Sequence, residues 1–168
     1  MLLQNNITEE QVWDLLREVP DPEVPVISVV ELGVVRNVLV EGESLIVTIT
    51  PTYSGCPAMK VIEDDIVSKL QANGISQIKV NTVFKPSWTT DWLTEDAKLK
   101  LKKFGIAPPE KVSAEDIFPF LKDNRAQIAC PRCNSLNTEM KSRFGSTACK
   151  ALHYCNDCKE PFEYFKCI

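Results

Sequence analysis

The chain has 168 residues, of which 44% are hydrophobic and 25% charged, and its net charge is −4. This composition is typical of a soluble globular protein, and the length allows one ordinary domain and a smaller second one. Because affinity for nucleic-acid phosphates depends on clustered cations, the acidic balance argues against a nucleic-acid partner. No cationic secretory signal is visible, and no apolar run reaches the roughly 18 residues of a membrane helix. We therefore expect a cytoplasmic protein that does not bind membranes.

The first predicted element is a short amphipathic helix. Thr8 and Gln11 form a capping-box pattern, and apolar residues follow at helical spacing, namely Val12, Leu15, Leu16 and Val19. Residues 20–25 contain three prolines, which remove backbone donors and restrict the residues before them. This stretch predicts an ordered loop after the helix.

The next elements predict a small layered sheet. Segments 34–40 and 45–50 are rich in β-forming residues and flank a short turn, which indicates a hairpin. After a break at 51–57, Met59, Ile62, Ile66 and Leu70 share one face of a predicted helix, and residues 78–83 suggest a third strand. The order α, β, β, α, β predicts an α+β fold, an α/β layer in which helices pack on a small mixed sheet.

A further helix is predicted between Thr94, its cap, and Gly105, its stop. Residues 106–129 begin with a pair of prolines and are mixed in character, which indicates a linker. The predicted organisation is therefore a domain over residues 1–105, a linker over 106–129 and a small module over 130–168.

The module carries two Cys-x-x-Cys pairs, Cys130 with Cys133 and Cys155 with Cys158, separated by 21 residues. Each pair can bind one metal ion from a single turn, and two pairs complete a tetrahedral four-sulfur shell. A segment this short cannot bury enough apolar surface to fold alone, so a metal crosslink is a physical requirement. The seven cysteines of a chain without export signal also favour metal binding over disulfides. We predict a zinc-ribbon-like module that holds structural zinc.

Three further residues keep the metal site open to other interpretations. Four thiolates suit iron, as a single ion or a cluster, as well as zinc. Cys149 and Cys167 are candidates for additional metal ligands, and the alternative is that each is a small buried hydrophobe. His153 could replace a cysteine, although a lone histidine beside four cysteines is more often a packing residue.

Cys56 is the other cysteine with chemical potential. It stands at a predicted strand-to-helix turn, where the helix dipole and free backbone N–H groups would stabilise its thiolate. Such a thiol can act as a nucleophile or bind metal, and the alternative is a buried cap. Asp21 and Glu23 could supply a carboxylate near Cys56, and the alternative for Asp21 is capping of a turn. No complete catalytic motif is recognisable, so we expect that the protein has no catalytic activity of its own.

Two sets of segments resemble known families. The N-terminal set resembles the SufT-like iron–sulfur assembly domain and comprises residues 21–25, 31–35 and 50–57, and residues 88–106 extend the likeness. The C-terminal set is similar to the PaaD family of phenylacetyl-CoA epoxidase accessory subunits and comprises residues 130–133, 144–152 and 160–167. Together the segments span nearly the whole chain.

The resemblance implies an accessory protein of phenylacetate degradation that assists maturation of an iron–sulfur cluster or a di-iron centre. Its implied partners are the phenylacetyl-CoA oxygenase, the iron–sulfur flavoprotein reductase of that enzyme and the iron–sulfur assembly machinery. Cys56 and Asp21 match the family's motif positions, which implies that they handle iron or cluster transiently. The other hypothesis is a redox or structural subunit of the oxygenase that carries a metal in its C-terminal cysteines.

Overall fold

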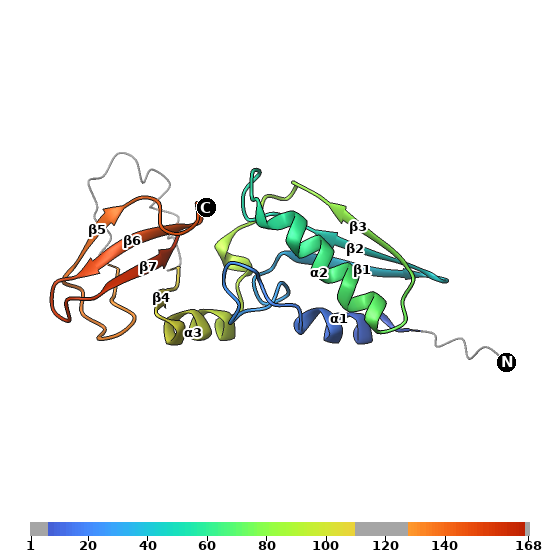
Figure 1. Ribbon diagram of the computed structural model, residues 1–168, viewed down its shortest axis with the longest axis horizontal. Helices are drawn as coiled ribbons and strands as arrows, with labels where there is room; N and C mark the ends of the chain where they lie inside the picture. Colours follow the sequence, from blue (N-terminus) through green and yellow to red (C-terminus); the bar gives the residue numbers. More distant parts are fainter. Residues whose placement is uncertain (1–6, 110–127, 167–168) are drawn as a thin grey trace. The chain divides into compact units, whose positions relative to one another are not determined.

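The computed structural model describes residues 7–109 and 128–166 of the chain. The chain forms two compact units, Met1–Trp88 and Thr89–Ile168 (Figure 1). The first contains helices α1 and α2 and strands β1 to β3, and the second contains the remaining elements. Within the described ranges, no helix is long and apolar enough to cross a membrane.

Helix α1 (Glu9–Arg17) begins at the predicted capping box. The Gln11 N–H donates to the Thr8 hydroxyl oxygen at 3.3 Å, and the Thr8 N–H donates to Gln11 Oε1 at 3.0 Å. These bonds satisfy two amide groups that would otherwise lack a partner near the helix start. Val12 and Leu16 are fully buried, so the predicted apolar stripe faces inward.

The first sheet has three strands in the order β1–β2–β3. Strands β1 (Val35–Glu41) and β2 (Ser44–Ile49) form the predicted antiparallel hairpin, and Gly42 supplies the left-handed backbone (φ 62°) of its turn. Strand β3 (Gln77–Thr82) pairs in parallel with β2, and helix α2 (Ala58–Ala72) makes the crossover between them. The sheet is therefore mixed, and the predicted α+β class is confirmed.

The core of the first unit anchors the loop that carries Cys56. In β2, buried positions alternate with half-buried ones, as expected for a strand whose one face is covered. Figure 1 shows α2 lying along this sheet. The buried apolar side chains of the two elements are Leu45, Val47, Ile49, Ile62, Ile66 and Leu70. Since both β2 and α2 are held by this core, the loop 50–57 between them is fixed at both ends.

The second unit begins with a 3₁₀ turn, η1 (Thr90–Trp92), and helix α3 (Glu95–Phe104). The Thr94 hydroxyl accepts the Ala97 N–H at 3.1 Å, and Gly105 ends the helix with a φ of 93°, both at predicted positions. A four-stranded sheet follows in the order β4–β7–β6–β5. Its strands are β4 (Ile106–Ala107), β5 (Thr138–Ser142), β6 (Lys150–Cys155) and β7 (Pro161–Phe165).

Two residues of the predicted linker belong to this second sheet. Ile106–Ala107 forms β4, which pairs in parallel with β7, and both side chains are buried. The physical reason is that a module short of apolar surface gains from every covered side chain. Ala107 joins a small core whose other buried members are Ile128, Cys130, Cys155 and Phe162. Residues 110–127 of the predicted linker lie outside the described residues, and residues 1–105 as one functional domain stay a prediction.

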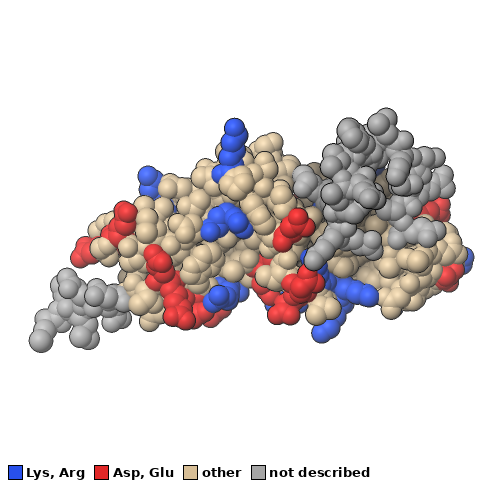
Figure 2. All heavy atoms as spheres, turned by 180° about the vertical axis from the view of Figure 1, so that it is seen from behind, with Lys and Arg blue, Asp and Glu red and all other residues tan. Residues whose placement is uncertain are grey.

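Charged side chains are interspersed over the face drawn in Figure 2. Lys and Arg alternate there with Asp and Glu, and the described residues of this face form no continuous basic surface. Recognition of nucleic-acid phosphates depends on a continuous basic surface of this kind.

Candidate functional site

The two Cys-x-x-Cys pairs are built in the same way. In the first, the Cys130 N–H donates to the Ser135 carbonyl at 2.9 Å, and in the second the Cys155 N–H donates to the Glu160 carbonyl at 3.0 Å. The residue after the second cysteine of each pair has a left-handed backbone; these residues are Asn134 (φ 60°) and Lys159 (φ 62°). Each pair thus forms a tight turn from which both thiols can reach one ion.

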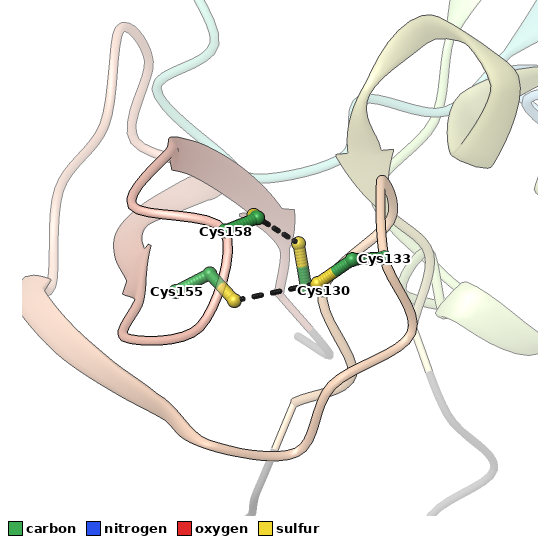
Figure 3. Close-up of side chains that lie close together, drawn as sticks. All are labelled: Cys130, Cys133, Cys155 and Cys158. Atoms are coloured by element: carbon green, nitrogen blue, oxygen red, sulfur yellow. Dashed lines mark hydrogen bonds between the residues drawn. The ribbon is translucent and has the colours of Figure 1, made fainter.

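The four predicted ligands converge on one point (Figure 3). All four Sγ atoms lie within 4.8 Å of one another, with Cys130 and Cys158 at 3.7 Å and Cys133 and Cys155 at 3.5 Å. Zn–S bonds of about 2.3 Å in tetrahedral geometry would place the sulfurs about 3.8 Å apart. A disulfide would need about 2.05 Å, and the four thiols are free. The donor set therefore fits one tetrahedral ion, for which zinc and iron are both suited.

The thiols of this cluster differ in their environment. Cys155 is buried, whereas Cys133 is exposed. The backbone N–H groups of Cys158 and Asp157 lower the pKa of Cys155 to about 7, and desolvation raises the pKa of Cys158 to about 12. Because thiolates are the metal ligands, binding of an ion must release protons from this site.

Hydrogen bonds of the backbone and of polar side chains join the two Cys-x-x-Cys pairs to each other. The Asn156 N–H donates to the Asn137 carbonyl at 2.8 Å, and Asn137 Nδ2 donates to Asp157 Oδ1 at 2.7 Å. The Ser135 hydroxyl donates to the other oxygen of Asp157. The hydrogen bonds from Ser135 and then Asn137 hold the pKa of Asp157 below its ordinary value. These contacts tie the second pair to the turn that follows the first.

The other candidate ligands lie away from the cluster or outside the described residues. Cys149 precedes β6 and Cys155 ends it, so about 20 Å of strand separates them. The Cys149 thiol is buried and lies 3.0 Å from the Thr147 hydroxyl. Cys167 lies outside the described residues. Among the described residues, the group of side chains that could hold a metal ion consists of the four cysteines of the two Cys-x-x-Cys pairs.

His153 is packed among aromatic rings. Its ring stacks on Phe162 with a centroid distance of 5.6 Å and meets Tyr164 edge-on at 5.7 Å. Burial lowers the pKa of His153, so the imidazole is neutral at pH 7. The structure agrees with the packing interpretation of this residue and not with a ligand role.

Cys56 lies in the loop between β2 and α2, as predicted. Its N–H donates to the Tyr53 carbonyl at 3.1 Å, and α2 starts two residues later at Ala58. The half-buried thiol is hydrogen-bonded to the Ala58 backbone and to the Thr52 side chain. Sequence reasoning missed Thr52, although its position in the same short loop was a usable signal.

The proline-containing loop brings two carboxylates close enough to act on Cys56. Asp21 is buried, and its Oδ1 accepts the N–H groups of Glu23 at 2.9 Å and Val24 at 2.8 Å. Asp21 therefore caps a turn, which was one of its two predicted roles. The charges of Glu23 and Asp21 also act on the Cys56 thiol, and a carboxylate near Cys56 was the other predicted role.

The pKa of Cys56 is raised, so the predicted stabilisation of its thiolate was wrong. Burial is the largest cause of the rise, and the negative charges of Glu23 and Asp21 add to it. The hydrogen bonds to Ala58 and Thr52 act in the opposite direction without compensating. The prediction considered the helix start alone, whereas the tertiary fold supplied burial and two carboxylates. The thiol is therefore protonated at neutral pH.

Comparisons with known proteins cover both units. The family model described as iron–sulfur cluster assembly protein matches residues 9–83, and that of the PaaD zinc beta ribbon domain matches residues 115–166. The chain is 46% identical to an Escherichia coli (strain K12) protein that is named as one of the subunits of a "Putative 1,2-phenylacetyl-CoA epoxidase". This similarity covers 94% of this chain and 92% of that protein.

The N-terminal part has further relatives. It is 38% identical to the "Fe-S protein maturation auxiliary factor" of Porphyromonas gingivalis (strain ATCC BAA-308 / W83), over 56% of this chain and 90% of that protein. A crystal structure of a domain of unknown function, DUF59, from Bacillus anthracis is similar with a TM-score of 0.53 and 31% identity. That similarity covers 55% of this chain and 90% of the other.

Proposed function

Because the chain belongs to the PaaD family, we propose that it is a non-enzymatic accessory protein of a phenylacetyl-CoA epoxidase and assists maturation of an iron–sulfur or di-iron centre. The similarity to a protein named as a component of that epoxidase supports an accessory role in the complex. The similarity of the first unit to a maturation auxiliary factor supports the maturation task. The proposed clients are the iron–sulfur flavoprotein reductase and the oxygenase, supplied by the iron–sulfur assembly machinery.

The observation that carries this proposal is that the half-buried Cys56 thiol lies within the electrostatic influence of the Glu23 and Asp21 carboxylates. Negative charges that disfavour a thiolate favour a cation at the same place. An iron ion that binds Cys56 would displace the thiol proton and gain the field of the two carboxylates. Without a cation, the protonated thiol is a weak nucleophile and resists oxidation. These properties suit a residue that holds iron or a cluster transiently, as cargo.

The four-cysteine cluster is proposed to hold a resident structural zinc. Its closed tetrahedral sulfur set leaves no open position for a substrate, which is typical of structural zinc sites. The zinc would supply the crosslink that the short sheet needs, and the second unit would then present a stable surface to a partner.

Replacement of Cys56 with Ala tests the maturation role. We expect the variant to keep its fold, while the reductase purified from cells that carry it loses visible absorption and iron relative to wild type. A matched control is Cys149→Ala, since this buried thiol lies outside the four-cysteine cluster. A fully loaded reductase in Cys56→Ala cells would contradict the proposal.

A redox subunit is the second candidate, because four thiolates at these distances also suit iron. Metal analysis and a visible spectrum of anaerobically purified protein separate the two candidates. Zinc without visible absorption supports a structural site, whereas stoichiometric iron with thiolate absorption supports electron transfer.

A further inference from the structure

The loop between β5 and β6, residues 143–149, is held by an ion pair between a buried lysine and a half-buried glutamate. Lys150 is 3% exposed, and its Nζ lies 3.2 Å from Glu163 Oε2. The other oxygen, Oε1, accepts the Ser146 N–H at 2.7 Å. A Cβ at Gly145 would lie 2.7 Å from that same oxygen, so a side chain at this position would require the Glu163 carboxylate to shift. Burial of the Lys150 ammonium costs desolvation energy, which the contact with Glu163 offsets.

This fixed loop holds an aromatic ring in solvent. Phe144 is 67% exposed, the highest value among the exposed large hydrophobic side chains of the described residues. Its N–H donates to the Ser142 hydroxyl oxygen at 3.1 Å, so its backbone is also anchored. An aromatic side chain gains free energy when its apolar surface is covered, and most of the Phe144 side chain is left uncovered.

One cation lies over this ring, and a second belongs to the preceding residue of the chain. Lys166 Nζ lies 4.8 Å from the centre of the Phe144 ring and donates to the Arg143 carbonyl at 2.9 Å. The Arg143 side chain is exposed, and in the described structure its guanidinium has no carboxylate partner. The carboxylates of Glu163 and Glu139 are paired with Lys150 and Lys141. Arg143, Phe144 and Lys166 are here named the Phe144 patch, in which an exposed ring is accompanied by two cations that have no carboxylate partner among the described residues.

We propose that the Phe144 patch docks on a partner protein whose surface has an apolar socket flanked by carboxylates. Phe144 enters the socket, and the carboxylates pair with Arg143 and Lys166. Aromatic and arginine side chains are the usual anchors of protein interfaces, and complementary charge selects the partner. The inference rests on the proposed function, because an accessory protein must hold its client, and it assigns that contact to the second unit.

The test is direct binding of the full-length, metal-loaded chain to the purified reductase and oxygenase of its own epoxidase system. We expect Phe144→Ala and Arg143→Glu each to weaken binding to one of these proteins by at least about tenfold. Leu136→Ala is the matched control, because Leu136 is another exposed apolar side chain (52%) and lies outside the patch. This variant should bind as tightly as wild type. Glu163→Gln should weaken binding with metal content unchanged, because it frees the loop without removing the ring.

The outcomes separate this inference from the proposed function. If wild type binds a client and the patch variants bind equally tightly, or Leu136→Ala loses as much, the patch is not the contact while the proposed function stands. If wild type binds neither protein, the client assignment fails and the patch fails with it. If wild type sediments as a dimer and Phe144→Ala as a monomer, the occupant is a second copy, which also overturns the proposal. Unchanged metal content and melting temperature of each variant exclude misfolding as the cause.

Discussion

Ser135 and Asp157 lie 22 residues apart in the chain, yet the Ser135 hydroxyl donates to Asp157 Oδ2 at 2.5 Å. The first residue follows one Cys-x-x-Cys pair, and the second lies inside the other. With Asn137 donating to Oδ1 of the same carboxylate, this contact holds the two pairs together through protein atoms alone. The four thiols are therefore positioned by hydrogen bonds as well as by any ion that they bind.

Asp157→Asn should accelerate loss of the bound metal. The substitution removes one acceptor and the charge that strengthens both hydrogen bonds. We expect transfer of zinc to a chromogenic chelator to become about tenfold faster. The matched control is Glu160→Gln, which removes a neighbouring charge and keeps the backbone hydrogen bond from the Cys155 N–H to the carbonyl of residue 160. This variant should release zinc at the wild-type rate. Equal release rates for both variants would show that the carboxylate has no part in holding the metal site.

Lys159→Gly should stabilise the second unit. Lys159 has a left-handed backbone, which costs a residue with a side chain about 1 kcal/mol and costs glycine nothing comparable. We expect a gain of about 1 kcal/mol in denaturant unfolding of the metal-loaded protein. Lys159→Ala keeps the strain and should show no gain. Asn134→Gly should gain less, because asparagine tolerates this conformation better than lysine. An equal gain for Ala and Gly at position 159 would contradict this explanation.

Removal of the metal should unfold the second sheet and leave the first unit folded. The core around the cysteines is small and contains two of the thiols themselves, whereas the first unit has a core of its own between sheet and helices. After chelation, we expect amide signals of β5 to β7 to collapse to random-coil positions while those of β1 to β3 remain. Retention of the dispersed β6 and β7 signals in metal-free protein would show that the sheet does not depend on the ion.

Glu23→Gln should make the Cys56 thiol more reactive. The negative charge of Glu23 raises the pKa of Cys56, so its removal lowers that pKa and increases the thiolate fraction at a given pH. Alkylation of Cys56, followed by mass spectrometry at mildly alkaline pH, should be faster than in wild type. In both proteins the rate should rise with pH, because the thiolate is the reactive form.

Glu43→Gln is the matched control for that experiment. Glu43 lies in the hairpin turn at the opposite end of β2 from the Cys56 loop, so its neutralisation should leave the rate unchanged. A slower reaction in Glu23→Gln would mean that the carboxylate activates the thiol, which reverses the proposed electrostatics.

The features that could be predicted from the amino-acid sequence are local in the chain. The capping box of Thr8 and Gln11 and the stop at Gly105 depend on neighbours within a few residues, and they formed where predicted. The spacing within each Cys-x-x-Cys pair is equally local, so the sequence predicts the four-sulfur cluster that the structure contains. The α+β class followed from the order of such local elements.

Which distant residues share an environment became visible in the folded structure alone. It placed β4 beside β7, left Cys149 at the far end of β6 from the metal cluster, and joined Ser135 to Asp157. It also brought the charges of Glu23 and Asp21 to bear on Cys56 and left its thiol half-buried, which reversed the direction of the predicted pKa shift. Burial and long-range charge depend on how separate elements pack, and no local pattern of residues encodes that packing.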